Sequence, residues 1–245
     1  MKLTLCLSLG LCSVLSYSGL VADSHVATYE LSVQNRVATQ QTSPAMQDGL
    51  DVQTTVQDPV QMLQTVTDQI MSTLKSKNKN FKKNPSALYH MVENLIFPHV
   101  DFVEMARWVV GRNAWQQANA AEKQAFIDAF QTLVVRSYAH SLLEYTDYRL
   151  SFSPLRHNQI KEQSRIEVSS MLKGEGRTLH VVYRLLRSGN LWKVYDIVFE
   201  NVSLIQGYRA QFADAIQGNG IASVIETLQK KNQRLNTNNT SIVQP

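Results

Sequence analysis

The sequence predicts a single α+β domain, in which helices precede and follow a four-stranded antiparallel sheet. Apolar residues recur at helical spacing up to about residue 145, alternate with polar residues from 148 to 199, and return to helical spacing after Ser203. The alternation indicates a sheet with one solvated face, so the other face needs helices to cover it. This order of elements is typical of the α+β class, and we place the domain at residues 58–231.

The two ends of the chain are expected to lie outside this domain. In residues 1–22, a positive charge at Lys2 is followed by an uncharged apolar run. This pattern predicts a signal peptide that is cleaved on secretion. Residues 23–57 are polar and show no sustained helical period, which predicts a disordered linker. Residues 232–245 have a similar composition and predict a disordered tail.

Two alternatives are open for residues 1–22. The apolar run approaches the ~20 residues that span a bilayer, so an uncleaved membrane anchor is one of them. Acylation of Cys12 is the other, although Leu11 before it is larger than the residue that lipoprotein processing usually needs. Cys6 and Cys12 are the two cysteines of the chain, so a cleaved protein would have no thiol for a disulfide or a metal.

Capping signals place the first two helices. Asp58 and Pro59 begin the first, because a carboxylate can cap free backbone N–H groups and proline fits the first helical position. The apolar stripe of this helix ends near residue 75. Pro85 begins the second helix and Pro98 ends it.

Two further helices are predicted before the sheet. Asp101 caps a short helix that closes at Gly111, since glycine accepts the backbone angles at a helix end. Asn119 and Glu122 resemble a capping box for the fourth helix. Its apolar face continues for about seven turns, to Tyr145, and a helix of this length needs a wide surface to pack on.

Four strands are predicted after this helix. The first contains Leu150, the second contains Ile166, the third covers residues 179–187 and the fourth covers residues 191–199. Residues 188–190, Ser-Gly-Asn, predict the hairpin turn between the last two strands.

A short corner then leads from the fourth strand into two final helices. Ser203 is the predicted N-cap of the first, because its hydroxyl can accept from a free backbone N–H. Tyr208 and Phe212 follow at helical spacing, and the second helix is built on Ile221 and Leu228.

Two blocks of sequence resemble one known family. Residues 191–212 read Leu-Trp-Lys-Val-Tyr-Asp-Ile-Val-Phe-Glu-Asn-Val-Ser-Leu-Ile-Gln-Gly-Tyr-Arg-Ala-Gln-Phe, and residues 100–111 read Val-Asp-Phe-Val-Glu-Met-Ala-Arg-Trp-Val-Val-Gly, before Trp115. Both are similar to blocks of the MlaC family, also called the toluene-tolerance family, of periplasmic phospholipid-binding proteins. Asn201 departs from that family, which usually has Gly there, but Asn tolerates a left-handed backbone.

This resemblance implies a curved sheet with helices over one face and an apolar lipid cavity between them. It also implies a periplasmic phospholipid carrier that shuttles glycerophospholipids between the outer and inner membranes and so maintains outer-membrane lipid asymmetry. No enzyme activity and no cofactor are implied. The implied partners are an inner-membrane ABC transporter, contacted through its MCE-domain subunit, and an outer-membrane lipoprotein–porin complex. The direction of transport is left open.

The expected wall of the cavity combines helix and strand positions. Periodicity indicates which residues face inward, and the resemblance supplies the cavity that they would line. The long helix would present three residues to six residues of the sheet: Val134, Tyr138 and Leu142 would face Ile166, Val168, Val181, Tyr183, Trp192 and Val194.

Exposed cations are candidates for docking to partners. A lysine-rich run after the first helix is interpreted either as a solvated loop or as a contact for an anionic partner or lipid surface. Three scattered arginines are the other candidates. The residues concerned are Lys75, Lys77, Lys79, Lys82, Lys83, Arg107, Arg112 and Arg209.

Other functions have weaker support in the sequence. The net charge of +4 is scattered, whereas nucleic-acid binding needs a concentrated basic stripe. Motifs for serine hydrolases, zinc proteases and nucleotide binding are missing, and the histidines lack ligand spacing. Asp196, beside Tyr195, could serve a pocket enzyme of the NTF2 kind, but the simpler interpretation is a hydrogen bond to the strand–helix corner. A secreted binding module for an isoprenoid or hopanoid is the other alternative.

Overall fold

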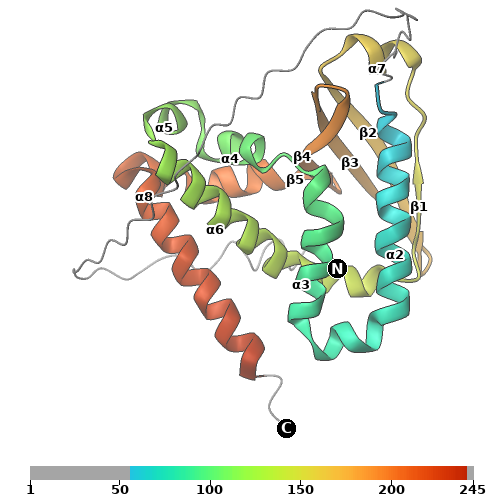
Figure 1. Cartoon of the computed structure of the whole chain (residues 1–245), viewed down its shortest axis with the longest axis horizontal. Coiled ribbons are helices and arrows are strands. Elements are labelled where there is room, and N and C mark those ends of the chain that lie inside the picture. Colours follow the sequence, from blue (N-terminus) through green and yellow to red (C-terminus); the bar gives the residue numbers. More distant parts are fainter. Residues whose placement is uncertain (1–55, 242–245) are drawn as a thin grey trace, which may run out of the picture.

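Five antiparallel strands form one sheet in the order of the sequence (Figure 1). They are β1 (Arg149–Phe152), β2 (Arg165–Gly174), β3 (Arg177–Ser188), β4 (Leu191–Phe199) and β5 (Val202–Ser203). The predicted four-strand meander is confirmed. The fifth strand was not predicted, because two residues are too few to show an alternation of apolar and polar side chains.

The computed structural model describes residues 56–241, without the side chains of 157–159 and 236–241. The predicted signal peptide and nearly all of the predicted linker lie outside the described residues. The last linker residue, Gln57, contacts the β3–β4 hairpin. Its N–H donates to the Asn190 carbonyl over 2.9 Å, and its Oε1 accepts from the Trp192 N–H over 3.1 Å.

Two helices, α2 (Pro59–Lys83) and α3 (Pro85–Ile96), lie side by side on one side of the sheet (Figure 1). Helix α2 crosses the strands, and α3 returns beside it before the short turn η1 (Phe97–His99). The predicted cap is confirmed, since the Asp58 carboxylate accepts from two backbone N–H groups. The predicted end at residue 75 was wrong. Neither Gly nor Pro interrupts the helix, and Phe81 is buried against α3.

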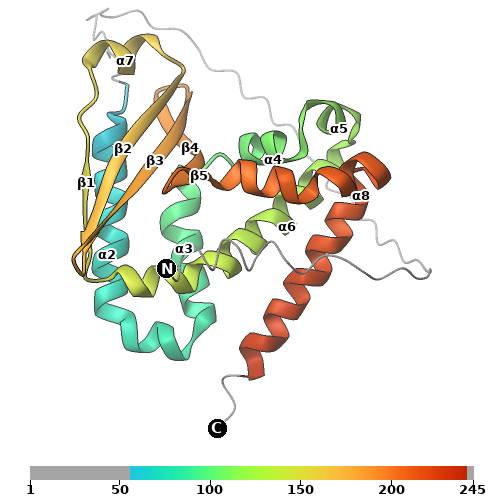
Figure 2. The same ribbon diagram turned by 180° about the vertical axis from the view of Figure 1, so that it is seen from behind.

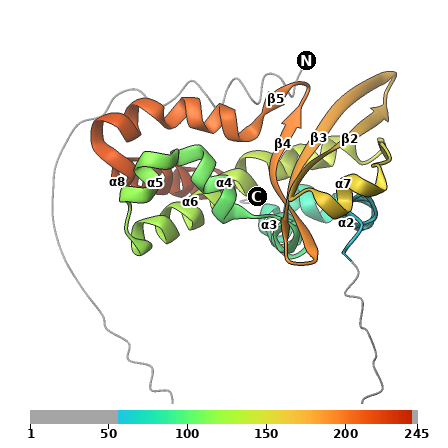
Figure 3. The same cartoon turned by 90° about the horizontal axis from the view of Figure 1, so that it is seen from above.

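The other helices form a layer beside the β4–β5 edge of the sheet (Figure 3). They are α4 (Phe102–Val110), α5 (Arg112–Gln117), α6 (Ala120–Tyr138) with its extension η2 (Ala139–Tyr145), and α8 (Leu204–Ser241). The caps predicted for α4 and α6 are confirmed, including both hydrogen bonds of the capping box. A further short helix, α7 (His157–Glu162), lies between β1 and β2.

The predicted seven-turn helix is shorter than expected. Regular α-helix ends at Tyr138, and residues up to Tyr145 form a 3₁₀ helix. Because a 3₁₀ helix turns about 120° per residue, the apolar face is re-aimed. Ala139 and Leu143 are buried with α2 and α3, as Val135 of α6 already is, rather than with α4 and α8.

Helix α8 is bent at Gly220, where a φ of 72° separates the two predicted helical segments. The second segment packs along α6 and continues past residue 231, where we placed the domain boundary (Figure 2). Asn232 is buried there. Its Nδ2 donates to the Ala129 carbonyl over 2.8 Å. Its backbone carbonyl accepts a hydrogen bond from the Arg136 side chain over 2.6 Å.

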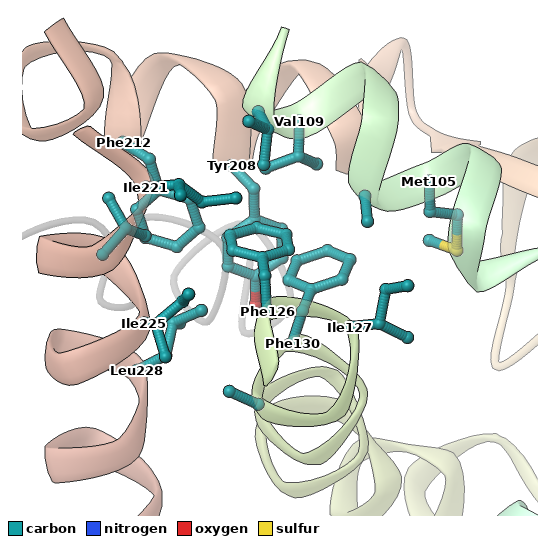
Figure 4. Packing of buried hydrophobic residues seen from close by; sticks show 14 of the residues in the cluster. Met105, Val109, Phe126, Ile127, Phe130, Tyr208, Phe212, Ile221, Ile225 and Leu228 are labelled. Atoms are coloured by element: carbon teal, nitrogen blue, oxygen red, sulfur yellow. The ribbon is translucent and has the colours of Figure 1, made fainter. Parts of the chain in front are cut away.

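Aromatic rings fill the centre of the helical layer (Figure 4). Phe126 and Phe130 of α6 pack edge-to-face against Phe212 and Tyr208 of α8, with neighbouring ring centroids 5.1 to 6.5 Å apart. Burying four aromatic side chains in one group supplies a large apolar contact between these two helices.

The corner between β4 and α8 is built around the buried Asp196, which is 1% exposed. Its Oδ2 accepts from the Ser203 hydroxyl over 2.7 Å and from Arg184 over 3.0 Å, and its Oδ1 accepts from the Ile205 N–H. The Ser203 Oγ also accepts from the Gln206 N–H, so the predicted cap is confirmed. Asn201 has a φ of 66°, the left-handed backbone that Asn tolerates.

A buried carboxylate also joins α4 to β2. Glu104, 6% exposed, accepts from Arg165 over 2.6 Å, from Arg107 over 3.0 Å and from the Trp108 Nε1 over 2.8 Å. Burial alone would raise the pKa of Glu104. Hydrogen bonds from Arg165 and Trp108 and the charges of both arginines outweigh it and hold that pKa below its ordinary value of 4.5.

We predict that Ser203→Ala lowers the free energy of unfolding by about 2 kcal/mol. The change removes the cap of α8 and one hydrogen bond to a buried carboxylate. Urea unfolding measures the difference, and Ser72→Ala, at an exposed helical serine, is the matched control. Equal stability of Ser203→Ala and the wild type would show that the corner does not depend on this hydroxyl.

We predict that Glu104→Gln lowers the free energy of unfolding by about 2 kcal/mol at pH 7, since hydrogen bonds to a charged group are lost. A carboxylate with a lowered pKa stabilises the fold above its unfolded pKa, and this stability is lost as the pH falls through the folded pKa. The difference should therefore shrink below pH 4.5, the ordinary value. Urea titrations across this range test it, with the exposed Glu162→Gln as control. A difference independent of pH would contradict the prediction.

Candidate functional site

The buried apolar residues of the domain form three clusters. The sheet cluster joins α2 to the sheet, the hairpin cluster joins α2, α3 and η2, and the helical cluster joins α4, α6 and α8. A domain of this size usually has one contiguous core with smaller satellites. The sheet cluster shares no residue with the other two, and Tyr195 of β4 is the strand residue that packs on the helical cluster.

Apolar side chains on the α2-facing side of the sheet are only half-buried. The strand register places them on the same face as Ile166 and Val168, which α2 covers. They continue this face toward β1 and the β2–β3 turn, where the side chains are half-buried. We call them the open inner face: Leu150, Phe152, Leu172, Leu179, Tyr183, Ile197 and Phe199.

Tyr183 shows what kind of environment this face provides. It is half-buried, and burial raises the pKa of its phenol to about 12, with Ser170 as its hydrogen-bond partner. Its ring lies 5.8 Å from that of Phe152. Tyr183 is thus a half-buried aromatic side chain that packs at the margin of the sheet cluster.

A β-bulge decides which residues of β4 join this face. Val194 pairs with Leu185 and Asp196 pairs with Arg184, so Tyr195 is the extra residue. The bulge reverses the alternation, because two residues of β4 oppose one of β3. Trp192 and Val194 therefore share a face with Ile197.

Asp196 consequently lies on the outer face of the sheet, in a row with Arg184 and Glu167. The predicted hydrogen bond between Asp196 and the corner is confirmed. A carboxylate held by Ser203, Ile205 and Arg184 at this place does not reach the open inner face.

The structure brings together only part of the predicted cavity wall. Trp192, Val194, Ile166, Val168 and Tyr183 meet in the sheet cluster, and Val181 is buried on the same face. The three helix residues lie elsewhere: Leu142 packs on the hairpin cluster, and Val134 and Tyr138 pack on the helical cluster.

Sequence reasoning missed most of the open inner face. Alternation in β1 could have pointed to Leu150 and Phe152, since both face the same side as the predicted wall. Ile197 and Phe199 could not be found in this way, because the bulge shifts their phase relative to Trp192.

The candidate docking cations lie on two distant parts of the molecule (Figure 1). The lysines belong to the last turns of α2, where all of them are exposed, so their placement in a loop was wrong. Arg107, Arg112 and Arg209 lie around the α4–α5 turn. A Cβ at Gly111 would be 3.8 Å from the Arg209 Nη2, which places Arg209 beside Arg112.

A separate pocket of about 340 Å³ lies between η1, α4, α6 and the β3–β4 hairpin. Polar groups such as Asp101, Gln124, Gln131 and Lys193 line much of it, so it does not extend the open inner face. Among residues 56–241 we find no cluster of three or more potential metal ligands. None of the helices in this range is long and apolar enough to span a bilayer.

Comparison with known proteins places this architecture in a family. A model of the MlaC protein family matches residues 64–230. The toluene tolerance protein ttg2D of Pseudomonas putida is 27% identical over 165 residues, which cover 67% of this chain and 75% of that protein. The intermembrane phospholipid transport system binding protein MlaC of Haemophilus influenzae is 22% identical over 176 residues, covering 70% of this chain and 81% of that protein.

A solved structure is also similar. It is that of a phospholipid-binding protein from Ralstonia solanacearum in complex with a phospholipid, with a TM-score of 0.67 and 28% identity. The match covers 73% of this chain and 99% of that one. The family model, the relatives and the fold agree with the two sequence blocks at residues 100–111 and 191–212, and the chain belongs to the MlaC family.

Proposed function

We propose that this protein binds a phospholipid and carries it between two membranes, with the acyl chains against the open inner face of the sheet. The observation that supports this most is the continuous set of half-buried apolar side chains on the α2-facing side of the sheet. The similar Ralstonia protein, which has a phospholipid in its complex, supports the same ligand class.

An apolar face of this kind meets the energetic requirement for carrying a lipid. Each methylene group gains about 0.8 kcal/mol on leaving water, so exposing two long acyl chains would cost about 20 kcal/mol or more. A bilayer already shelters these chains. A carrier therefore needs a surface about as apolar as the membrane, and no catalytic group, while the polar headgroup stays in water.

Localisation and partners follow from the family and belong to the same proposal. Residues 1–22 would direct the chain to the periplasm and be removed there. The carrier would exchange lipid with the MCE-domain subunit of an inner-membrane ABC transporter and with an outer-membrane lipoprotein–porin complex. Such exchange would maintain the lipid asymmetry of the outer membrane.

Solvent extraction of the purified protein, followed by mass spectrometry, tests the ligand class. We expect glycerophospholipid at close to one molecule per protein. Recovery of an isoprenoid or hopanoid instead would show that the protein is a binding module for that other class of apolar ligand. Recovery of no lipid, with no uptake from phospholipid micelles, would contradict the proposal.

Matched variants on β3 test where the chains lie. Val181 and Val182 are neighbours on opposite faces, because successive side chains of a strand alternate. Val181→Phe should fill part of the internal space and reduce co-purified lipid several-fold in a folded protein, whereas Val182→Phe should leave it unchanged. If Val181→Phe instead destabilises the fold by about 1 to 3 kcal/mol and lipid per folded molecule is unchanged, Val181 closes a packed core.

The arginines around the α4–α5 turn fit a protein partner. Trp108 and Val103 of α4 are 42% and 56% exposed, and exposed Trp beside Arg is typical of interface hot spots. We predict that Arg112→Gln with Arg209→Gln slows association with the MCE-domain subunit, most at low salt, without loss of bound lipid.

The control for this variant is Arg149→Gln with Arg177→Gln, which changes the net charge equally at exposed positions on the sheet. Surface plasmon resonance at two salt concentrations gives the association rates. Equal rates for both double variants and the wild type would remove the α4–α5 turn from the docking surface.

A further inference from the structure

Helix α2 carries a row of lysines that has no part in the proposed lipid site. At about 100° per residue, Lys75, Lys79 and Lys82 lie within about 60° of one another around the helix, with Lys83 at the edge of the same face. We call these four residues the lysine row. It extends for about 12 Å along the helix. Lys77 lies about 160° from Lys75 around the helix and is outside the lysine row.

The lysine row is held in a fixed place. Leu74 and Phe81 anchor the same turns of α2 from another side, and both are buried with α3. Asn84 ends α2, and its side chain accepts from the Ala87 N–H to begin α3. The lysines therefore project from a rigid helical hairpin, at the end of the molecule remote from α4 and α5 (Figures 1 and 2).

The lysine row has no acidic neighbour within α2 or the first two turns of α3. The sequence has no acidic residue between Asp68 and Glu93. All four lysines are exposed, and none of them takes part in an ion pair within the described part of the chain. Lysines at a helix C-terminus are also favoured by the helix dipole, so the row costs the fold little.

We propose that the lysine row docks this protein reversibly on an anionic phospholipid bilayer. The row consists of lysines alone, whose compact point charges on flexible stems can follow mobile anionic headgroups without a fixed bidentate geometry. The large apolar side chains that are exposed among the described residues lie on other elements. The contact is therefore electrostatic, without the aromatic anchors of a protein interface and without insertion into the acyl region.

The strength of such a contact suits a carrier that must leave the membrane again. A lysine near an anionic surface contributes about 1 kcal/mol, which corresponds to about a five-fold change in partition coefficient. The contact weakens as salt screens the charges. This inference goes beyond the proposed function, because a bilayer surface is not one of the proposed protein partners and its contact needs no cargo.

Vesicle co-sedimentation tests the proposal with the protein purified from the cell envelope. The probes are vesicles of phosphatidylglycerol and phosphatidylethanolamine in equal parts, compared with vesicles of phosphatidylcholine alone. We expect binding to the anionic vesicles only, lost at high salt. Lys79→Gln should lower the partition coefficient about five-fold, and Lys77→Gln, on another face of the same helix, should lower it less.

A triple variant, Lys75→Gln, Lys79→Gln and Lys82→Gln, should lose on the order of 100-fold in binding. Its control changes Lys123, Lys161 and Lys230 to Gln, which alters the net charge equally on other elements. All variants share one N-terminus, so any contribution from that segment cancels. Circular dichroism confirms that each variant is folded.

Three results would overturn the proposal. The first is equal binding to anionic and neutral vesicles. The second is an equal loss of vesicle binding in the two triple variants, or in Lys77→Gln and Lys79→Gln. Binding would then depend on the net charge of the protein and not on the position of the lysine row. The third is a row variant that binds vesicles normally but associates more slowly with the MCE-domain subunit, which would assign the row to a protein partner. A protein that yields no lipid on extraction would contradict the proposed function alone.

Discussion

The carboxylate of Asp196 is the point on which the two halves of the molecule depend. It binds the first turn of α8 through Ser203 and Ile205, and it binds β3 through Arg184. Removing one partner of a buried charge usually costs several kcal/mol, so the direction in which α8 leaves the sheet is strongly determined. Helix α8 runs away from the sheet and does not fold back across it (Figures 2 and 3). The inner face is left to α2.

This division explains why the apolar residues collect in separate clusters. The helices of the helical layer bury their apolar side chains around the rings of Phe126 and Phe130. The sheet buries its apolar side chains under α2. The link through Glu104 and Arg165 joins the two bodies by polar contact at the outer side of the sheet. Polar contacts at the corner and at α4 thus fix the position of the helical layer relative to the sheet.

Local chemistry made much of the fold predictable, and long-range geometry limited the rest. The caps at Asp58 and Ser203 were found because a capping side chain bonds within its own turn. The end of α2 was missed because its last turns are stabilised by Phe81, whose burial against α3 is a tertiary contact. In the candidate site, Trp192 was predicted on the inner face, but Ile197 was not, because a bulge leaves no clear mark in an aromatic, β-branched strand.

The separate packing of the sheet and the helical layer gives the cargo of the proposed carrier a second role, as a removable part of its core. A ligand that binds only the folded state stabilises it by RT ln(1 + [L]/Kd), so occupancy and folding stability are linked. The loaded form would be the more rigid one, with Tyr183 and Phe152 in contact with acyl chains on their open sides. Delivery of the lipid would leave the same fold with fewer contacts, and the empty carrier would be the form most exposed to proteolysis.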